Sequence, residues 1–139
     1  MKPEKKLSTL LQEMNPQLQE GDYVFVSVPN LQEYMDLIPA TVGTFKEKEG
    51  WTLILPEKVA QDQHLDYSLL MSWITMEIHS ALDAVGFTAA FSAALAGENI
   101  SCNVVAGYHH DHLFVPNTTA KKAMNILGKL SQQNHYNDL

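Results

Sequence analysis

Residues 82–116, "LDAVGFTAAFSAALAGENISCNVVAGYHHDHLFVP", predict a short loop that contains Gly86, then a helix, then two strands. Large apolar side chains recur at helical spacing after the loop, with small alanines between them: Phe87, Phe91 and Leu95. Such a helix is narrow and can lie close against a sheet. The two strands flank Gly107, and Pro116 ends the second one.

The same order of elements occurs earlier in the chain. The first half contains a strand at 22–29, a short helix at 30–38, two strands at 41–56 joined at Gly50, and a helix start at 57–63. The second half contains a strand at 66–79, the helix after Gly86, the strand pair around Gly107, and a helix at 118–133. Both halves therefore give strand, helix, strand, strand, helix.

The two halves agree best where a strand meets a helix. "WTLILPEKVA" and "DHLFVPNTTA" each contain an apolar strand, a proline and a helix start, and Pro56 and Pro116 lie 60 positions apart. Two copies are too few for an open repeat array, so we expect a duplicated small α+β unit. The alternative is a coincidental likeness between two α+β halves.

Length and composition favour a soluble cytoplasmic protein. The chain has 139 residues, of which 45% are hydrophobic, and this is enough for a packed core. Its single cysteine, Cys102, cannot form an internal disulfide, so a reducing compartment is expected.

The N-terminal residues predict an amphipathic helix and not a signal peptide. Apolar residues recur there at helical spacing: Leu7, Leu10, Leu11, Met14 and Leu18. The sequence lacks an apolar run long enough to span a bilayer, so no membrane partner is expected.

Charge excludes one class of partner and limits how an anion can be bound. The formal net charge of −7 repels nucleic acid, and a compensating basic stripe is missing from the sequence. All nine basic residues are lysines, so the sequence has no arginine that could bind a carboxylate or phosphate through two parallel hydrogen bonds. An anionic ligand would have to bind lysine, polar side chains or backbone N–H groups.

The quoted stretch resembles the ACT domain, a small ferredoxin-like regulatory module, and in particular stand-alone bacterial proteins with two ACT-like halves. The resemblance is carried by the loop glycine Gly86, by "A-G-x-N-I" at residues 96–100, and by the strand "LFVP". It is close over 67–132, whereas 22–65 share only the order of elements.

The resemblance implies ferredoxin-like units in tandem, with antiparallel sheets that are covered by helices on one face. We therefore divide the chain into a degenerate N-terminal ACT-like half with a leading amphipathic helix, 1–65, and an ACT domain, 66–139. An ACT domain usually closes with a fourth strand, and "SQQNHYNDL" at 131–139 is a poor strand. The other half, the N-terminal segment or a second chain would have to supply that strand.

The resemblance also implies a regulatory protein that binds an amino-acid-like effector between two units, without a cofactor. The ligand-binding residues that we predict are His79, Asp83, Val85, Gly86, Phe87 and Asn99. The resemblance matches Gly86 to the family's loop glycine, and Asp83 and Asn99 to positions that often contact the effector, whereas His79 is chosen because it lies close to the Gly86 loop in sequence. Gly86 allows close backbone approach, and the helix start after it offers N–H groups to a carboxylate. Asp83 could pair with an amino group, and Asn99 could donate and accept hydrogen bonds. Alternatively, Asp83 only caps the helix and Asn99 only forms a turn.

A cluster of histidines, His109, His110 and His112, surrounds Asp111 in the strand pair. Strand alternation places His110 and His112 on one face and Asp111 on the other, with His109 at the turn. A structural metal site would need four ligands, and only Cys102 and His79 could join, so we predict no metal. We favour a turn that faces water. The alternatives are imidazoles that line the effector interface, or a metal-responsive protein that uses the His109–His112 hairpin.

Enzymatic activity is the interpretation that the sequence supports least. Ser80 lies next to His79 and near Asp83, but without a nucleophile motif, so we expect no catalytic residues. We expect a homodimer, because a sheet without its closing strand leaves an exposed edge. A regulatory output would pass through an unidentified protein partner. A purely structural interaction module is a further alternative.

Overall fold

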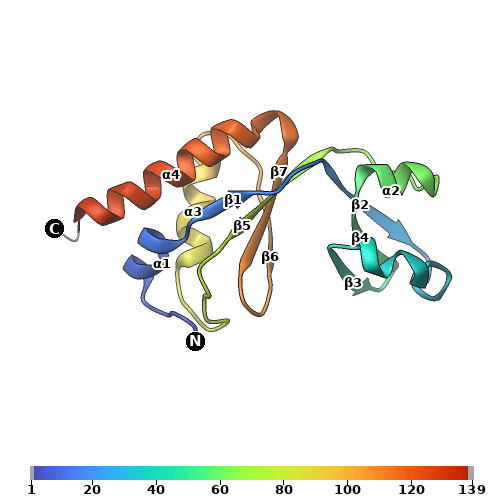
Figure 1. Cartoon of the computed structure of the whole chain (residues 1–139), viewed down its shortest axis with the longest axis horizontal. Helices are drawn as coiled ribbons and strands as arrows, with labels where there is room; N and C mark the ends of the chain where they lie inside the picture. Colours follow the sequence, from blue (N-terminus) through green and yellow to red (C-terminus); the bar gives the residue numbers. More distant parts are fainter. Residues whose placement is uncertain (1, 138–139) are drawn as a thin grey trace. The chain divides into compact units, whose positions relative to one another are not determined.

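The computed structural model describes the backbone of residues 2–137 and the side chains of residues 2–134. The chain forms two compact units (Figure 1). Residues 21–71 make up the inserted unit, and the residues before and after them make up the split unit. The sequence analysis divided the chain at 65/66. In the structure, the N-terminal residues up to 20 group with the residues from 72 onward, because α1 packs on α3 and α4.

The split unit contains a four-stranded sheet in the order β1-β5-β7-β6. Its strands are β1 (Pro16–Leu18), β5 (Met71–Met76), β6 (Asn103–Ala106) and β7 (Asp111–Pro116). Its helices are α1 (Leu7–Glu13), α3 (Phe87–Ala96), the short 3₁₀ helix η2 (Asn117–Thr119) and α4 (Ala120–Asn137). β5 covers only residues 71–76 of the strand that the sequence predicted over 66–79.

The N-terminal segment supplies the closing strand of the split unit. β1 pairs antiparallel with β5, so that Pro16 lies opposite Met76 and Leu18 lies opposite Ile74. This pairing decides between the three sources that the sequence left open. An edge strand of three residues has too few positions to show an alternation, so the sequence could not reveal it.

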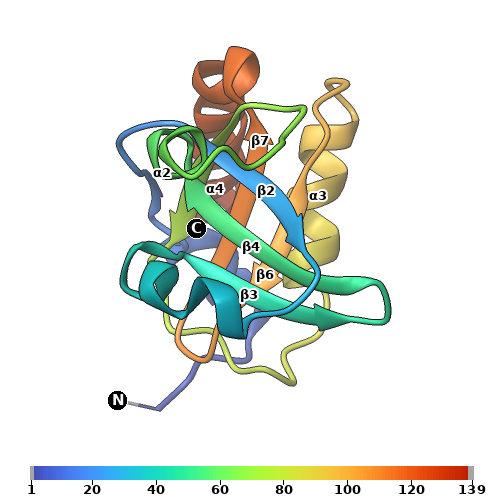
Figure 2. The ribbon, with the colours of Figure 1, turned by 90° about the vertical axis from the view of Figure 1, so that its right-hand side faces the viewer.

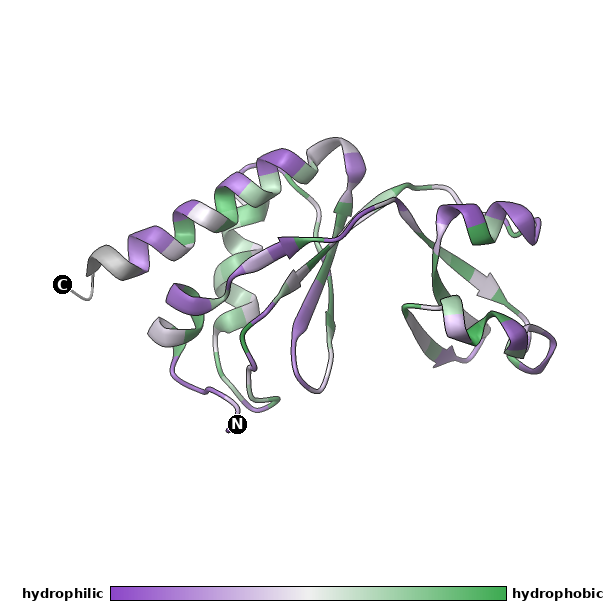
Figure 3. Cartoon of the chain, in the orientation of Figure 1, coloured by the Kyte–Doolittle hydropathy of each residue, from purple (hydrophilic) through white to green (hydrophobic). Residues whose placement is uncertain are grey.

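The core of the split unit lies between one face of its sheet and the three α-helices. Buried side chains from every layer meet there, including Leu10 of α1, Met14 directly after it, Ile74 of β5, Phe91 of α3, Leu113 of β7 and Leu127 of α4. The predicted amphipathic N-terminal helix is confirmed by the burial of Leu10, Leu11 and Met14. Figure 3 shows that α3 is apolar along its length, as its alanines and phenylalanines predict.

The inserted unit is smaller and has the same α+β character. It contains β2 (Tyr23–Val28), the 3₁₀ helix η1 (Gln32–Ala40), β3 (Gly43–Glu47), β4 (Gly50–Pro56) and α2 (Glu57–Asp62). Its strands lie side by side in the order β3-β4-β2 (Figure 2), with antiparallel pairing. Val24, Val26, Leu53, Leu55 and Ala60 form its core. Gly50 has a φ of +147° and turns the predicted strand pair.

The predicted junction between strand and helix occurs twice with one backbone conformation. Pro56 ends β4 with φ −55° and ψ 139°, and Pro116 ends β7 with φ −52° and ψ 134°. A helix follows each proline directly. The chain is thus α+β, with antiparallel strand pairs and helices on one face of each sheet, as predicted. Within residues 2–137, none of the helices has the length and apolar composition needed to cross a bilayer.

Candidate functional site

The loop between β5 and α3 ends at Gly86, in a conformation that favours glycine. Gly86 has φ +95° and ψ −11° and is the N-cap residue of α3. A side chain in this conformation would be strained. The cap makes no side-chain hydrogen bond to the helix, so the first-turn N–H groups of α3 lack a capping side chain. This helix start suits the approach of a negatively charged group.

The N-terminal segment lies along this loop and is bonded to it. Glu4 donates its backbone N–H to the carbonyl of His79 at 2.8 Å, and its own carbonyl accepts from the N–H of Ala81 at 2.8 Å. Lys5 Nζ lies 2.8 Å from Asp83 Oδ2. The hydrogen bond from Lys5, together with its charge, lowers the pKa of Asp83. Asp83, which we expected to meet a ligand, therefore already has a partner.

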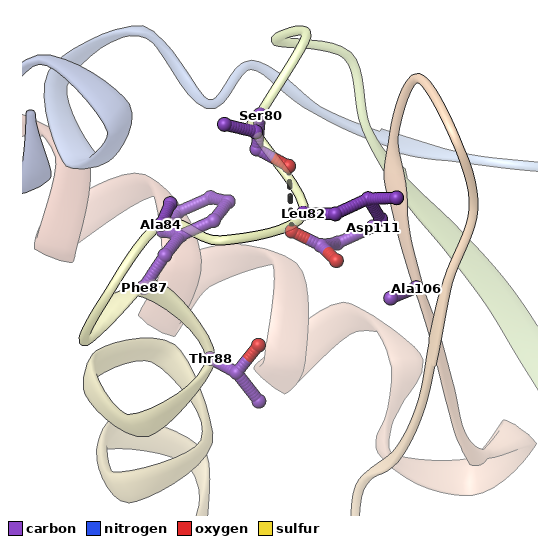
Figure 4. Close-up of a pocket in the computed structure, with 8 residues that line it drawn as sticks. Ser80, Leu82, Ala84, Phe87, Thr88, Ala106 and Asp111 are labelled. Atoms are coloured by element: carbon purple, nitrogen blue, oxygen red, sulfur yellow. Dashed lines mark hydrogen bonds between the residues drawn. The ribbon is translucent and has the colours of Figure 1, made fainter. Parts of the chain in front are cut away.

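Two pockets share the wall formed by residues 80–82. The wider pocket has a volume of about 310 Å³ and is lined mainly by the loop residues 79–83, together with Pro3, Lys5 and Tyr108. The smaller pocket has a volume of about 80 Å³ and lies between the loop, the start of α3 and the start of β7 (Figure 4). Two of the predicted ligand residues, His79 and Asp83, thus line one pocket.

The smaller pocket contains a buried carboxylate that the sequence analysis did not select as a ligand residue. Asp111, the first residue of β7, is only 8% exposed and accepts a 2.9 Å hydrogen bond from Ser80 Oγ (Figure 4). The sequence signal was available, because strand alternation placed Asp111 opposite His110 and His112 and so on the core side. In this strand pair, the prediction considered ligand chemistry only for the histidines, of which His110 and His112 lie on the other face of the strand.

The remaining predicted residues lie in different surroundings. Val85 is 84% exposed, whereas Phe87 is buried in the core and lines the smaller pocket through its ring. Asn99 lies beyond the other end of α3, with a φ of +60°, in a separate pocket of about 320 Å³ beside Ser101 and Thr119. The ten residues of α3 span about 15 Å. Within one unit, the Gly86 loop and the segment at 97–101 therefore lie at opposite ends of α3.

His110 and His112 do not face the solvent as turn residues. His112 is half-buried, and its Nδ1 lies 3.0 Å from Trp73 Nε1 and 3.1 Å from Thr75 Oγ1. His110 Nδ1 lies 3.1 Å from the carbonyl of Ile78. The prediction that His110 and His112 face water is therefore wrong. Residues of β5 and of the loop after it lie within hydrogen-bond distance of both imidazole rings.

His79 and His109 lie close together at the tip of the strand pair. The ring centroids of His79 and His109 are 4.9 Å apart, and Tyr108 lies 5.0 Å from His109 and 6.2 Å from His79. Partial burial, followed by the nearby charges of His109 and His110, lowers the pKa of His79. In the part of the chain that the structure describes, histidine, cysteine and carboxylate side chains do not gather in groups of three or more that could hold a metal.

Comparisons with known proteins agree with the repeated architecture. Models of the ACT domain match residues 2–72 and 71–129 in tandem. The chain belongs to the ACT domain family. The two matches follow one another along the sequence and meet near residue 71, whereas the packing places the first 20 residues of this ACT protein with its second half. No curated protein matches the sequence.

Several solved structures are similar to this chain. A Vibrio cholerae protein of unknown function, described as a possible transport protein, is 47% identical, with a TM-score of 0.81, 91% of this chain covered and 97% of that one. An Agrobacterium tumefaciens protein is 18% identical, with a TM-score of 0.62 and coverage of 84% and 87%. The ligand-free regulatory subunit of aspartate kinase from Thermus thermophilus is 8% identical, with a TM-score of 0.62 and coverage of 84% and 97%. At these low identities, the last two show likeness of fold alone.

Proposed function

We propose that this ACT protein is a non-catalytic regulator that binds an amino-acid-like ligand at the loop before α3. The observation that carries the proposal is the loop itself. Gly86 lies in the left-handed region, α3 starts beside the smaller pocket without a capping side chain, and the loop before it lines both pockets. A chain without arginine can bind a ligand carboxylate through such backbone N–H groups. The fold that it shares with a regulatory subunit of aspartate kinase supports a regulatory role.

Five of the six candidate residues belong to this site in one unit: His79, Asp83, Val85, Gly86 and Phe87. His79 and Asp83 line the wider pocket, Val85 is exposed on the loop, and Phe87 lines the smaller pocket. Asn99 is about one helix length away, so it joins the same site only if a second copy of the chain brings it there. We therefore keep Asn99 as a ligand residue in a homodimer.

Ligand binding would change how the N-terminal segment is held. Asp83 pairs with Lys5 in the structure, so a ligand ammonium group at Asp83 competes with Lys5. Residues 4 and 5 are bonded to the loop, and α1 follows at residue 7. Ligand binding therefore affects the segment that leads to the closing strand β1. We propose that a cytoplasmic protein partner detects this change.

The experiment is a thermal-shift screen of the chain against the twenty amino acids, with Zn²⁺ and Ni²⁺ alongside. A ligand at one hundred times its Kd adds about 2.7 kcal/mol of stability, which gives a readily measured rise in Tm. A rise with one or a few amino acids supports the proposal. A rise with the metals alone would instead favour a metal-responsive protein, and the absence of any rise would contradict ligand binding.

Calorimetry with the amino acid that is found then tests the site. Asp83→Ala should weaken binding by about tenfold or more, because it removes a charge-assisted hydrogen bond. Asp36→Ala removes an exposed carboxylate of η1 and is the matched control. Asn99→Ala should weaken binding only if the ligand-bound form is a homodimer, which sedimentation of the same sample determines.

A further inference from the structure

Two imidazole rings from segments that are far apart in the sequence lie close together in the split unit. His79 belongs to the loop after β5, His109 belongs to the turn between β6 and β7, and their ring centroids are 4.9 Å apart. Tyr108 lies beside both rings, with its centroid 5.0 Å from that of His109 and 6.2 Å from that of His79. The proposed function gives His79 a place in the wider pocket and leaves its pairing with His109 without a role.

The separation of the two rings is the one that a shared metal ion requires. Metal–nitrogen bonds to histidine are about 2.0–2.1 Å long, so two rings bound to one ion have centroids about 4.5–5.2 Å apart, for angles from square-planar to tetrahedral. The observed separation of 4.9 Å lies within this range. His109 is exposed, and exposed side chains change rotamer within nanoseconds, so its ring can turn a nitrogen atom toward the ion.

The nitrogen atoms of both rings are available for binding. Within residues 2–137, the rings of His79 and His109 make no hydrogen bond, whereas Nδ1 of His110 lies 3.1 Å from the carbonyl oxygen of Ile78. Burial, followed by the nearby charges of His109 and His110, lowers the pKa of His79, so this ring is mostly neutral at neutral pH. The neutral imidazole is the form that binds a metal ion.

Two side chains suit some metal ions better than others. A structural Zn²⁺ site has four protein ligands, and the described histidine, cysteine and carboxylate side chains do not gather in groups of three or more. Cu²⁺ and Ni²⁺ accept a square-planar shell with imidazole ligands, and Cu²⁺ binds a given site more tightly than Ni²⁺ or Zn²⁺. The net charge of −7 also favours a cation over an anion.

We propose that His79 and His109 form a two-histidine site for a divalent transition-metal ion, which binds Cu²⁺ more tightly than Ni²⁺ or Zn²⁺. Solvent fills the remaining positions of the ion. The site differs from the pair His110 and His112 that strand alternation placed on one face. His79 and Tyr108 both line the wider pocket, so an ion between His79 and His109 fastens together two segments of the pocket wall.

The competing explanation is that the two rings only pack against each other and against Tyr108. Such packing contributes to stability whether or not a metal ion is present. It predicts that a change at His79 or His109 alters unfolding to the same extent with and without metal. Only the proposal predicts a metal affinity that needs both imidazoles at once, so the test compares single variants with the double variant.

The probes are Cu²⁺, Ni²⁺ and Zn²⁺, with Mg²⁺ as the control ion, each titrated into the full chain at pH 7.5 without amino acids or chelators. Calorimetry gives the affinity and stoichiometry, and EPR of the Cu²⁺ complex counts the bound nitrogen atoms. The variants are His79→Gln, His109→Gln and both together. His64→Asn is the matched control, because His64 is an exposed histidine of the inserted unit with a φ of +54°, which asparagine tolerates.

The expected result is one Cu²⁺ per chain with two bound imidazole nitrogens, weaker binding of Ni²⁺ and Zn²⁺, and no binding of Mg²⁺. Each single variant should weaken Cu²⁺ binding by at least about tenfold, because changes to residues that merely orient metal ligands already cost about 10–100-fold. The double variant should bind about as weakly as either single variant, because one imidazole alone forms no chelate. His64→Asn should bind Cu²⁺ like the wild type.

Unchanged Cu²⁺ affinity in folded His79→Gln or His109→Gln would overturn the proposal. Fully additive effects of the two changes would also overturn it, because they indicate two independent sites. If His79→Gln does not fold, the exposed position His109 decides through His109→Gln.

The inference stands apart from the proposed function. Chains that bind amino acids but give equal Cu²⁺ affinity in wild type and His109→Gln would refute only the metal site. Chains that show the expected loss of Cu²⁺ binding in His109→Gln but bind no amino acid would support the metal site and refute only the proposed function.

Discussion

Trp73 Nε1 donates a hydrogen bond of 3.0 Å to Nδ1 of His112. An indole N–H can only donate, so Nδ1 must accept and the ring proton lies on Nε2. Protonation of Nδ1 would place two donors against each other. Burial, followed by the neighbouring charge of His110, lowers the pKa of His112, while Asp111 opposes the shift. The structure therefore holds His112 neutral.

Stability should fall on mild acidification because of this pair. The folded-state pKa of His112 lies below the ordinary value of 6.5, so the unfolded chain takes up the proton first. The contribution of His112 is present above pH 6.5 and is lost as the pH falls through the lower folded-state pKa. Urea unfolding at pH 7.5 and 5.5 measures the effect. His112→Gln should show a smaller loss between these values, and an equal loss in wild type and variant would exclude His112 as the cause.

Trp73→Phe should destabilise the protein by about 0.5–1.5 kcal/mol at pH 7.5 through loss of this hydrogen bond, plus the cost of the smaller ring. It should also raise the pKa of His112, because the opposing donor is gone. Histidine NMR titration follows this pKa directly. A variant with an unchanged His112 pKa would show that the donor does not control its protonation.

Gly86→Ala should lower the free energy of unfolding by about 1–2 kcal/mol, because an L residue is strained at φ +95°. A Cβ atom there would also lie 3.3 Å from Leu7 Cδ2. Gly128→Ala is the control, because it lies inside α4 with no atom near its Cβ position. It should stabilise the protein by about 0.5–1 kcal/mol. Equal effects at the two glycines would contradict the backbone argument.

Lys5→Ala should raise the pKa of Asp83 toward its ordinary value, because the largest cause of its lowering is the hydrogen bond from Lys5. The pair is exposed on both sides, so the free energy of unfolding should change little. Carboxyl NMR titration of Asp83 gives the pKa. An unaltered value would mean that the ion pair does not persist in solution.

Leu10→Ala tests whether the N-terminal helix belongs to the split unit. Leu10 is fully buried in the core that contains Phe91 and Leu127, so the substitution should cost about 2–5 kcal/mol. Hydrogen exchange should speed up in α3 and α4 more than in β2 and β4. Faster exchange that is confined to the inserted unit would contradict the observed packing.

Several features were readable in advance because they depend on neighbours in sequence. The spacing of Phe87, Phe91 and Leu95 defined α3, and the alternation after Gly107 placed Asp111 opposite His112. The two proline junctions at 56 and 116 showed the duplication. These patterns hold because helix and strand periodicities are fixed by backbone geometry, whatever the rest of the chain does.

The sequence alone determined the α+β class, the repeated order of elements and the loop glycine before α3, because each depends on local spacing and backbone conformation. Only the tertiary structure decided which segments meet. It placed Pro16–Leu18 beside Ile74–Met76, joined Ser80 to Asp111, and separated Gly86 from Asn99 by the length of α3. Pairings across tens of residues are selected by burial of the whole core. A three-residue edge strand is too short to show an alternation, and the alternation that places Asp111 on the core side does not say which residue will bond to it.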